Sequence, residues 1–320
     1  MSPSAASKRV TVPELDDLRE LLPDWRRHLR SINRASSTIT SYLTVGEEFV
    51  DFLVTQGMPT SASVITREHV EHYIVHLQER PNRRTGKPLS AAQVAKHYRS
   101  LQQLFRWLDE IEGEITVNPF TKMKAPHVPE QPVPVLTDDE LRALLGTCKG
   151  RSFEDRRDTA LIRFLTDSGP RVGEIAPLEL GNLDFDTDVA DVLGKGGRWR
   201  AIPFGNKTGE AMRRYIRARA RHPKASTTDR VWIGRSGALT ESGIAQIIRR
   251  RGEQAGIMGL HPHMFRHTFA HVFLADGGQE QDLMRLAGWR SREMVGRYGA
   301  SAADQRAREA HRRAALGDRV

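Results

Sequence analysis

A proline-rich stretch near the middle of the chain limits what this sequence can fold into. The stretch, APHVPEQPVPV at residues 125–135, holds four prolines and shows no helical spacing of apolar residues. Proline fixes φ and lacks an N–H group, so it interrupts helices and sheets, and proline-rich segments act as extended spacers. The stretch therefore predicts a linker at 126–135 between two domains, residues 1–125 and residues 136–320.

The first domain is expected to be helical throughout. Apolar residues recur at helical spacing in four segments, and a capping-box pattern at Ser90 and Gln93 opens the last of them. A basic loop, ERPNRRTGKP, separates the third segment from the fourth. The predicted helices are Leu18–Leu29, Thr38–Phe52, Thr66–Arg80 and Ser90–Gly113.

The second domain is expected to combine helices with a small sheet. Thr137 and Glu140 form another capping box, and a helix from Glu154 ends before Gly169. Residues 183–204, LDFDTDVADVLGKGGRWRAIPF, alternate short β-rich runs with turn residues. Further helices follow, among them an arginine-rich one at 213–221. The predicted fold class is therefore mainly α with a small antiparallel β-sheet.

The charge balance indicates a polyanionic partner. Lysine and arginine number 49 against 40 acidic residues, which gives a net charge of +9. Such an excess favours nucleic acid, ahead of an anionic membrane surface. No apolar run approaches the roughly 20 residues that span a bilayer, and the N-terminus lacks a signal-peptide core. We therefore expect a cytoplasmic, nucleoid-associated protein, in which the single Cys148 excludes an intrachain disulfide.

Four residues suit the cleavage of a phosphodiester. Arg171, in DSGPRVGEI, and Arg266, in HPHMFRH, can fork onto the non-bridging oxygens. Lys195, in a tight turn, can protonate a leaving 5′ oxygen, and the hydroxyl of Tyr298 can serve as a nucleophile. Taken singly, an arginine or a hairpin lysine is more often an ordinary surface residue.

The order of the segments that carry these residues is more informative than any one of them. DSGPRVGEIAPLEL, GKGGRWRAIP, HPHMFRHTFAHVFLADGG and MRLAGWRSREMVGRY follow one another along the chain. This series resembles the motifs of the tyrosine recombinases, the phage integrase family. The resemblance covers roughly the whole chain. It implies a helical, SAM-like core DNA-binding domain at 1–125 and an α+β catalytic domain at 136–320 that ends in a tail helix.

The resemblance also implies a role for each matching residue. Arg171 and Arg266 would clamp the scissile phosphate, and His263 would share in proton handling beside it. Lys195 would be the general acid. Tyr298 would attack the phosphorus and form a 3′-phosphotyrosyl link.

Three further positions match the family pattern or depart from it. Trp289 stands in LAGW where most members have histidine. Its indole N–H can still donate to a phosphate oxygen, but it cannot titrate. Glu174 and His267 match family positions with supporting structural roles.

The implied activity is site-specific recombination or integration, in which DNA strands are cut and rejoined by way of a Holliday junction. No cofactor or metal would be needed, since the covalent link conserves the bond energy and cations neutralise the phosphate. The partners would be double-stranded DNA at specific sites, a homotetramer on two duplexes, and accessory DNA-bending or directionality factors, with no membrane. Because the first predicted helix begins near Leu18, we expect the compact form that lacks an arm-binding domain.

Other interpretations stay open at this point. His263, His267 and His271 share one helix face, which raises the alternative of a metal enzyme; however, the first and third would lie about 12 Å apart. A DNA-binding protein that no longer cuts, and a topoisomerase that relaxes any supercoiled DNA, are two more alternatives. The basic segments at 83–99 and 213–224 are expected to grip the duplex from opposite sides.

Overall fold

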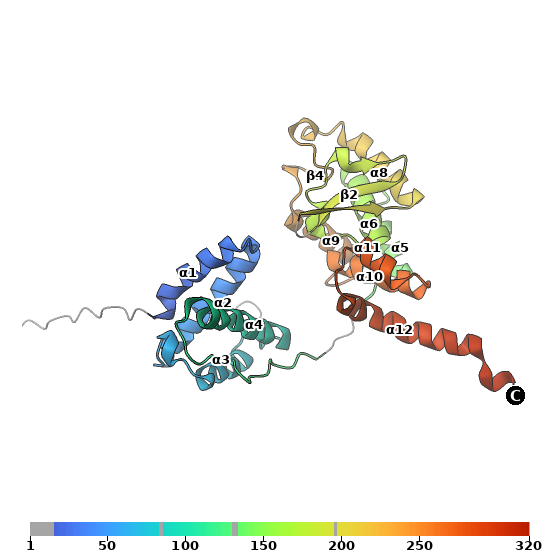
Figure 1. Cartoon of the computed structure of the whole chain (residues 1–320). Helices are drawn as coiled ribbons and strands as arrows, with labels where there is room; N and C mark the ends of the chain where they lie inside the picture. Colours follow the sequence, from blue (N-terminus) through green and yellow to red (C-terminus); the bar gives the residue numbers. More distant parts are fainter. Residues whose placement is uncertain (1–15, 83–85, 130–133, 195–196, 320) are drawn as a thin grey trace, which may run out of the picture. The chain divides into compact units, whose positions relative to one another are not determined.

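The computed structural model describes residues 16–82, 86–129, 134–194 and 197–319. The side chains of several residues between 297 and 319, Tyr298 among them, lie outside that description. Internal contacts divide the chain into two compact units, Met1–Glu130 and Gln131–Val320. These are the first and second units below, coloured along the chain in Figure 1.

The first unit is a bundle of helices around an aromatic core. Its elements are α1 (Leu18–Ser31), α2 (Ser36–Thr55), the short η1 (Ala62–Val64), α3 (Arg67–Glu79), α4 (Ala91–Trp107) and the π-turn η2 (Leu108–Glu112). Trp25, Phe49, Tyr73 and Phe105 are buried at its centre, where α2 packs against α1, α3 and α4. The helical prediction for this half of the sequence is confirmed, including the capping box at Ser90.

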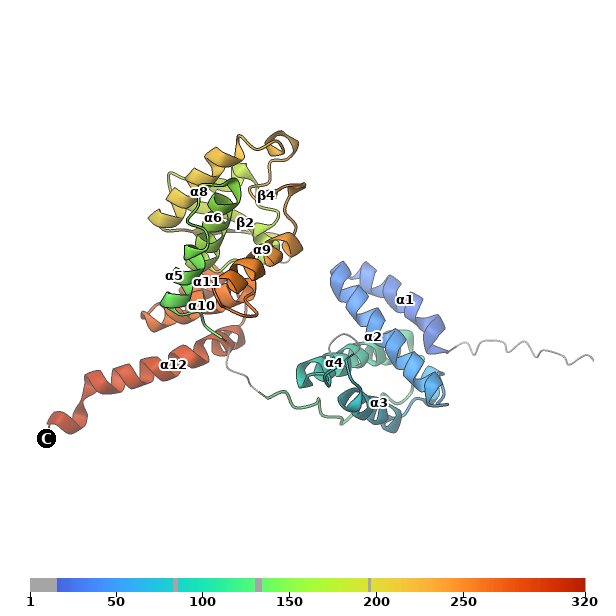
Figure 2. The same ribbon diagram turned by 180° about the vertical axis from the view of Figure 1, so that it is seen from behind.

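The second unit surrounds a central helix. Its helices are α5 (Asp138–Gly146), α6 (Phe153–Ser168), α7 (Val172–Ile175), α8 (Asn206–Arg219), α9 (Glu241–Gln254), α10 (Pro262–Ala275), α11 (Glu280–Ala287) and α12 (Arg292–Ala314), with short turns η3 (Leu180–Asn182), η4 (Ala225–Thr227) and η5 (Leu316–Arg319). Helix α6 packs against α8, α9 and α10 and buries Leu161, Phe164 and Leu165 (Figure 2). The predicted capping box at Thr137 is confirmed at the start of α5.

The expected antiparallel sheet lies at residues 183–203. It has the order β1 (Leu183–Asp184), β2 (Val189–Gly194) and β3 (Arg198–Pro203). Ala190 pairs with Ile202 on the buried face, and Leu193 pairs with Trp199 on the exposed face. A second hairpin, β4 (Ile233–Gly234) with β5 (Gly237–Ala238), was not predicted, because two-residue strands leave no period for a sequence pattern to show.

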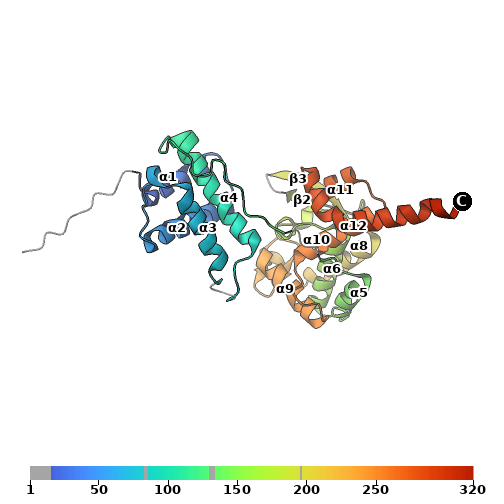
Figure 3. The ribbon, with the colours of Figure 1, turned by 90° about the horizontal axis from the view of Figure 1, so that it is seen from below.

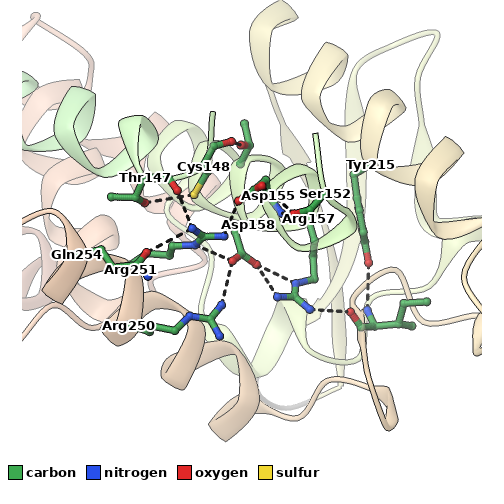
Figure 4. Close-up of polar contacts among 12 residues, drawn as sticks. Thr147, Cys148, Ser152, Asp155, Arg157, Asp158, Tyr215, Arg250, Arg251 and Gln254 are labelled. Atoms are coloured by element: carbon green, nitrogen blue, oxygen red, sulfur yellow. Dashed lines mark hydrogen bonds and ion pairs between the residues drawn. The ribbon is translucent and has the colours of Figure 1, made fainter. Parts of the chain in front are cut away.

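A buried carboxylate ties α6 to α9 (Figure 4). Asp158 is fully buried, and its Oδ1 lies 2.7 Å from Nη2 of Arg157. Its Oδ2 accepts hydrogen bonds from Nε of Arg251 at 2.8 Å and from Nη2 of Arg250 at 3.2 Å. A second carboxylate, Asp155, lies 3.0 Å from Nη2 of Arg251. Buried charges of opposite sign thus compensate one another, which offsets their loss of hydration.

Within the described ranges, no helix has both the length and the apolar character needed to cross a membrane.

Candidate active site

The site begins where α6 ends. Gly169 closes α6 in the left-handed conformation, with φ of 55°. A Cβ at this position would stand 2.7 Å from Cδ1 of Phe269, so both the conformation and the space require glycine. The chain turns here and brings Arg171 to the N-cap of α7.

Glu174 holds Arg171 in place through two contacts. The backbone N–H of Arg171 donates to Oε2 of Glu174 at 2.8 Å, and its Nη1 donates to Oε1 at 2.9 Å. Glu174 is buried, whereas the Arg171 side chain keeps 35% of its surface exposed. One side of this guanidinium is therefore fixed to the protein while another side is open to a ligand. The structural role expected for Glu174 agrees with this arrangement.

A third arginine, Arg200 on β3, joins the same carboxylate. Its Nη2 donates to Oε2 of Glu174 at 2.6 Å, and its Nη1 donates to the carbonyl oxygen of Leu286 at the end of α11. Burial alone would raise the pKa of Glu174, but the charge and hydrogen bond of Arg200, together with the contacts from Arg171, lower it below its ordinary value. Glu174 is therefore ionised at neutral pH and neutralises part of the arginine charge.

Arg200 was missed by the reasoning from sequence, although a signal for it existed. Strand residues alternate between faces, so Arg200 must share the face of buried Ile202, two positions later. An arginine on a buried face needs an acidic or carbonyl partner. That requirement marks Arg200 as a residue of the site or of its support.

Arg266 lies almost completely buried in α10, with 1% of its surface exposed. Its Nη1 donates to the carbonyl oxygen of Gly169 at 2.8 Å, and its Nη2 donates to the carbonyl oxygen of Ala287. The guanidinium lies 5.2 Å from the ring centroid of Trp289, a cation–π contact. Arg266 thus connects the ends of α6 and α11.

Gly288 lets the arginines approach one another. It ends α11 in the left-handed conformation, with φ of 63°. A Cβ there would lie 3.1 Å from Cδ and Nε of Arg200 and 3.8 Å from Nη1 of Arg171. Residues from β3, α7, α10 and the end of α11 therefore meet at one place, and three of the sequence-predicted residues, Arg171, Arg266 and Trp289, are among them.

His263 lies at the start of α10 and lines a pocket of about 480 Å³ together with Arg171, Pro170, Leu193 and Gly194. The His263 ring also lies edge-on to that of His267, with centroids 4.5 Å apart. Protein atoms crowd the His263 imidazole and reduce its hydration although part of the side chain is exposed. This effect, reinforced by the positive charge of Arg266, lowers its pKa below the ordinary value of 6.5. At neutral pH the ring is therefore uncharged and can accept a proton.

The lowered pKa predicts how stability depends on pH. Unfolded chains protonate His263 near its ordinary value, whereas the folded protein resists protonation, so stability falls as pH drops below 6.5 toward the folded pKa. We expect the free energy of unfolding of the wild type to decline more steeply in this window than that of His263→Gln, as measured by urea unfolding at stepped pH. The carboxylates are the same in the wild type and in His263→Gln, so their contribution to the pH dependence cancels in the comparison. Parallel curves would contradict the prediction.

The structure describes only the backbone of Tyr298 and does not describe Lys195, the other two residues predicted from the sequence. Lys195 lies outside the described residues, although Gly194, which precedes it, lines the same pocket as Arg171 and His263. Tyr298 belongs by its backbone to α12, a helix that packs against α10, while its side chain lies outside the description. Val295, three residues before Tyr298, is buried in a cluster that includes Trp289.

In the part of the chain that the structure describes, no three side chains of His, Cys, Asp or Glu are placed to share a metal ion. His261 is the N-cap residue of α10, with Nδ1 3.1 Å from the carbonyl oxygen of Gly259. Cys148 is buried, and this burial raises the pKa of its thiol.

The arginine-rich segment expected to grip DNA has two kinds of arginine. Arg213 donates to the carbonyl oxygen of Phe185 at 2.6 Å and covers the Phe185 ring. Arg219 is buried and donates to the carbonyl oxygens of Arg230 and Thr228. These two hold the second unit together, whereas Arg214 and Arg217 are exposed.

Comparison with protein families gives two matches. Residues 134–305 match the model described as the phage integrase family, and residues 21–114 match the phage integrase N-terminal SAM-like domain. The chain is 31% identical to tyrosine recombinase XerC of Oceanobacillus iheyensis. The match extends over 265 residues, which are 81% of this chain and 84% of the relative. It is 28% identical to tyrosine recombinase XerD of Bifidobacterium longum, over 79% of this chain and 83% of the relative.

Solved structures share the fold. The XerH site-specific recombinase bound to its palindromic difH substrate matches with a TM-score of 0.70 at 17% identity, over 91% of this chain and 83% of that one. The Tn1549 transposon integrase in complex with transposon right-end DNA matches with a TM-score of 0.72 at 20% identity, over 93% of this chain and 99% of that one. The mainly helical architecture with a small antiparallel sheet is thus that of these proteins.

Proposed function

The chain belongs to the phage integrase family and is a tyrosine recombinase, an enzyme that cuts and rejoins DNA at specific sites by way of a covalent tyrosine intermediate. We propose which of its residues carry out this reaction. The observation that carries the assignment is the convergence of Arg171, Arg266 and Trp289 around Gly288. Of the two proposed clamp residues, Arg171 has one side open to a non-bridging oxygen, whereas Arg266 is 1% exposed and its guanidinium is oriented by two carbonyl oxygens. Trp289 adds an indole N–H to the same set of donors.

In the proposed reaction, the Tyr298 hydroxyl attacks the phosphorus, and the bond to the 5′ oxygen of the DNA breaks. The enzyme is then joined to the 3′ phosphate, and a free 5′ hydroxyl remains. His263, uncharged at neutral pH, is suited to take the tyrosine proton. Lys195 would give a proton to the leaving 5′ oxygen, since it follows Gly194 at the pocket.

Rejoining follows from the same groups acting in reverse. A 5′ hydroxyl attacks the phosphotyrosine, so the bond energy is conserved and no nucleotide is consumed. When the hydroxyl comes from a partner strand, the products are recombined, and the exchange of one pair of strands gives a Holliday junction. The arginines neutralise the charge that develops on the phosphate.

We further propose that residues 1–125 and 136–320 act as DNA-binding and catalytic domains on duplex recombination sites, joined by the linker at 126–135. Four copies would act on two duplexes, with α12 as the element through which neighbours meet. Accessory DNA-bending or directionality factors and a cytoplasmic, nucleoid-associated location fit this role. The likeness to tyrosine recombinases XerC and XerD supports the proposal.

The experiment that tests the function is incubation with nicked duplexes from the native locus in EDTA. The nick lets a short fragment diffuse away after cleavage and so traps the intermediate. We expect a protein–DNA adduct that is linked to the 3′ phosphate and is sensitive to protease. Cleavage that needs a divalent cation and leaves no adduct would instead support a metal nuclease.

A change at Arg266 tests the proposed clamp. Arg266→Lys keeps the charge but cannot donate to two carbonyl oxygens and cover Trp289 at once. We expect single-turnover cleavage of the nicked duplex to slow by about 10²-fold or more. The matched control is Arg235→Lys, at an exposed position, which should cleave at the wild-type rate. Equal cleavage rates for the two variants would show that Arg266 does not help to bind the scissile phosphate.

A further inference from the structure

A second concentration of positive charge lies on the second unit, in a groove of about 1050 Å³ between α5, α6 and α8. We call it the basic groove. Its cationic lining consists of Arg142, Lys149, Arg151, Arg156, Arg163, Lys207, Arg214 and Arg217. Glu210 is the one acidic residue in the lining.

Most of this charge is not neutralised by the protein. Arg214 pairs with Glu210 at 2.8 Å, and Arg142 pairs with Asp139 on the first turn of α5. Among the described residues, the other six cationic side chains of the basic groove make no ion pair or hydrogen bond through their charged groups. This excess of positive charge attracts an anionic ligand to the basic groove.

The basic groove is separate from the active site. The residues that line it include none of those that line the pocket of Arg171 and His263. Its α6 residues run from Arg156 to Arg163, while the active site begins beyond the C-terminal end of that helix. Figures 1 and 3 show α5 and α8 on one side of the unit and α9, whose first residue Glu241 lines the active-site pocket, on the other.

We propose that the basic groove binds the sugar–phosphate backbone of a duplex DNA segment other than the one at the active site. Arginine and lysine on three helices supply the fork-shaped and point-like contacts that phosphates accept. No aromatic side chain lines the groove within the described residues, which removes the stacking platform that single strands use. The ligand is therefore recognised by charge and not by base sequence. This inference does not depend on the catalytic roles assigned above.

A protein partner fits the groove less well. Protein interfaces bury a central apolar patch with aromatic anchors, and charged side chains are depleted there. In the basic groove, Leu145 is the one large aliphatic lining residue, and it stands among eight cationic side chains. The phosphates of a nucleic acid can pair with cationic side chains along the whole length of the groove.

The test compares two charge-matched variants of the full chain. Arg163→Gln/Arg217→Gln removes two charges from the basic groove, and Arg235→Gln/Arg249→Gln removes two exposed charges of the same unit that do not line the groove. Binding of a fluorescent 20-base-pair duplex of unrelated sequence is measured from 50 to 200 mM salt. We expect the groove variant to bind about 10-fold more weakly and its log–log salt slope to fall by about two, since each lost phosphate contact removes close to one. The control should stay within about 2-fold of the wild type.

Three outcomes would overturn the proposal. One is equal DNA binding by the groove variant and the control. Another is a matching loss of adduct formation on a short nicked native-site duplex, which would place these charges at the active-site interface. The third is binding of a polyglutamate peptide that is lost in the groove variant while DNA binding is unchanged, which would assign the groove to an acidic protein. Retained adduct formation together with weaker binding of the unrelated duplex is the supporting result.

Discussion

A Tyr298→Phe variant is expected to bind its recombination site and to form no covalent adduct. Phenylalanine keeps the aromatic ring but lacks the oxygen that must bond to phosphorus, so the variant has no nucleophile at this position. Loss of a nucleophile removes catalysis by at least on the order of 10⁴-fold. The measurement is adduct formation on the nicked native-locus duplex in EDTA, together with the Kd for the uncut duplex.

The matched control for this change is Tyr42→Phe. Tyr42 stacks on Trp25 in the first unit, with ring centroids 5.6 Å apart, far along the chain from the assigned catalytic residues. That variant should form the adduct at the wild-type rate. Equal adduct formation by Tyr298→Phe and the wild type would show that another residue is the nucleophile.

Replacing Asp158 with alanine is expected to destabilise the second unit strongly. The change leaves Arg157 and Arg251, both with side chains less than 10% exposed, without the carboxylate that they share. Removing one partner of a buried ion pair costs about 3–5 kcal/mol, because the remaining charge is buried without compensation. The free energy of unfolding from urea titration of the full chain should fall by that amount.

Two further variants make the Asp158 prediction decisive. Asp158→Asn keeps the shape and one acceptor oxygen, so we expect a smaller loss than for alanine, and this variant should fold even if the alanine variant does not. Asp191→Ala changes an exposed aspartate on β2 and should alter stability by less than about 0.5 kcal/mol. A loss at Asp158 no greater than at Asp191 would show that the arginines find other partners.

Local sequence signals predicted the elements but not the contacts between them. Ser90 and Thr137 start helices because each side chain accepts a hydrogen bond from an N–H three residues later, a rule that operates within one turn. Glycines that end helices, such as Gly169, follow an equally local rule. In contrast, α11 was not predicted as a separate helix, because the chain around it offers a short apolar pattern and no capping side chain.

In the candidate site, too, the sequence identified residues in local motifs but not the contacts between distant residues. Arg171, Arg266 and Trp289 could be named from the sequence because their motifs occur in a recognisable order. Arg200 was missed: strand alternation places it on the buried face, but its partners, Glu174 and the carbonyl of Leu286, are 26 and 86 residues away, so no local pattern identifies what it binds. Nor could the sequence separate the arginines of α8 that hold the fold from those that face solvent, since the two kinds alternate within a few residues of each other.

The C-terminal end of α11 has a further consequence for the reaction. Its last two carbonyl oxygens, those of Leu286 and Ala287, accept hydrogen bonds from Arg200 and Arg266. The negative end of a helix thus anchors both guanidinium groups through uncharged peptide groups that do not titrate. Over the range of pH in which the enzyme is folded, these anchors keep the same strength. The positions of the two arginines are therefore insensitive to pH on this side of the site. The pH dependence of cleavage should originate in Glu174, the titratable partner of Arg171 and Arg200, and in the proposed reactive groups His263, Lys195 and Tyr298.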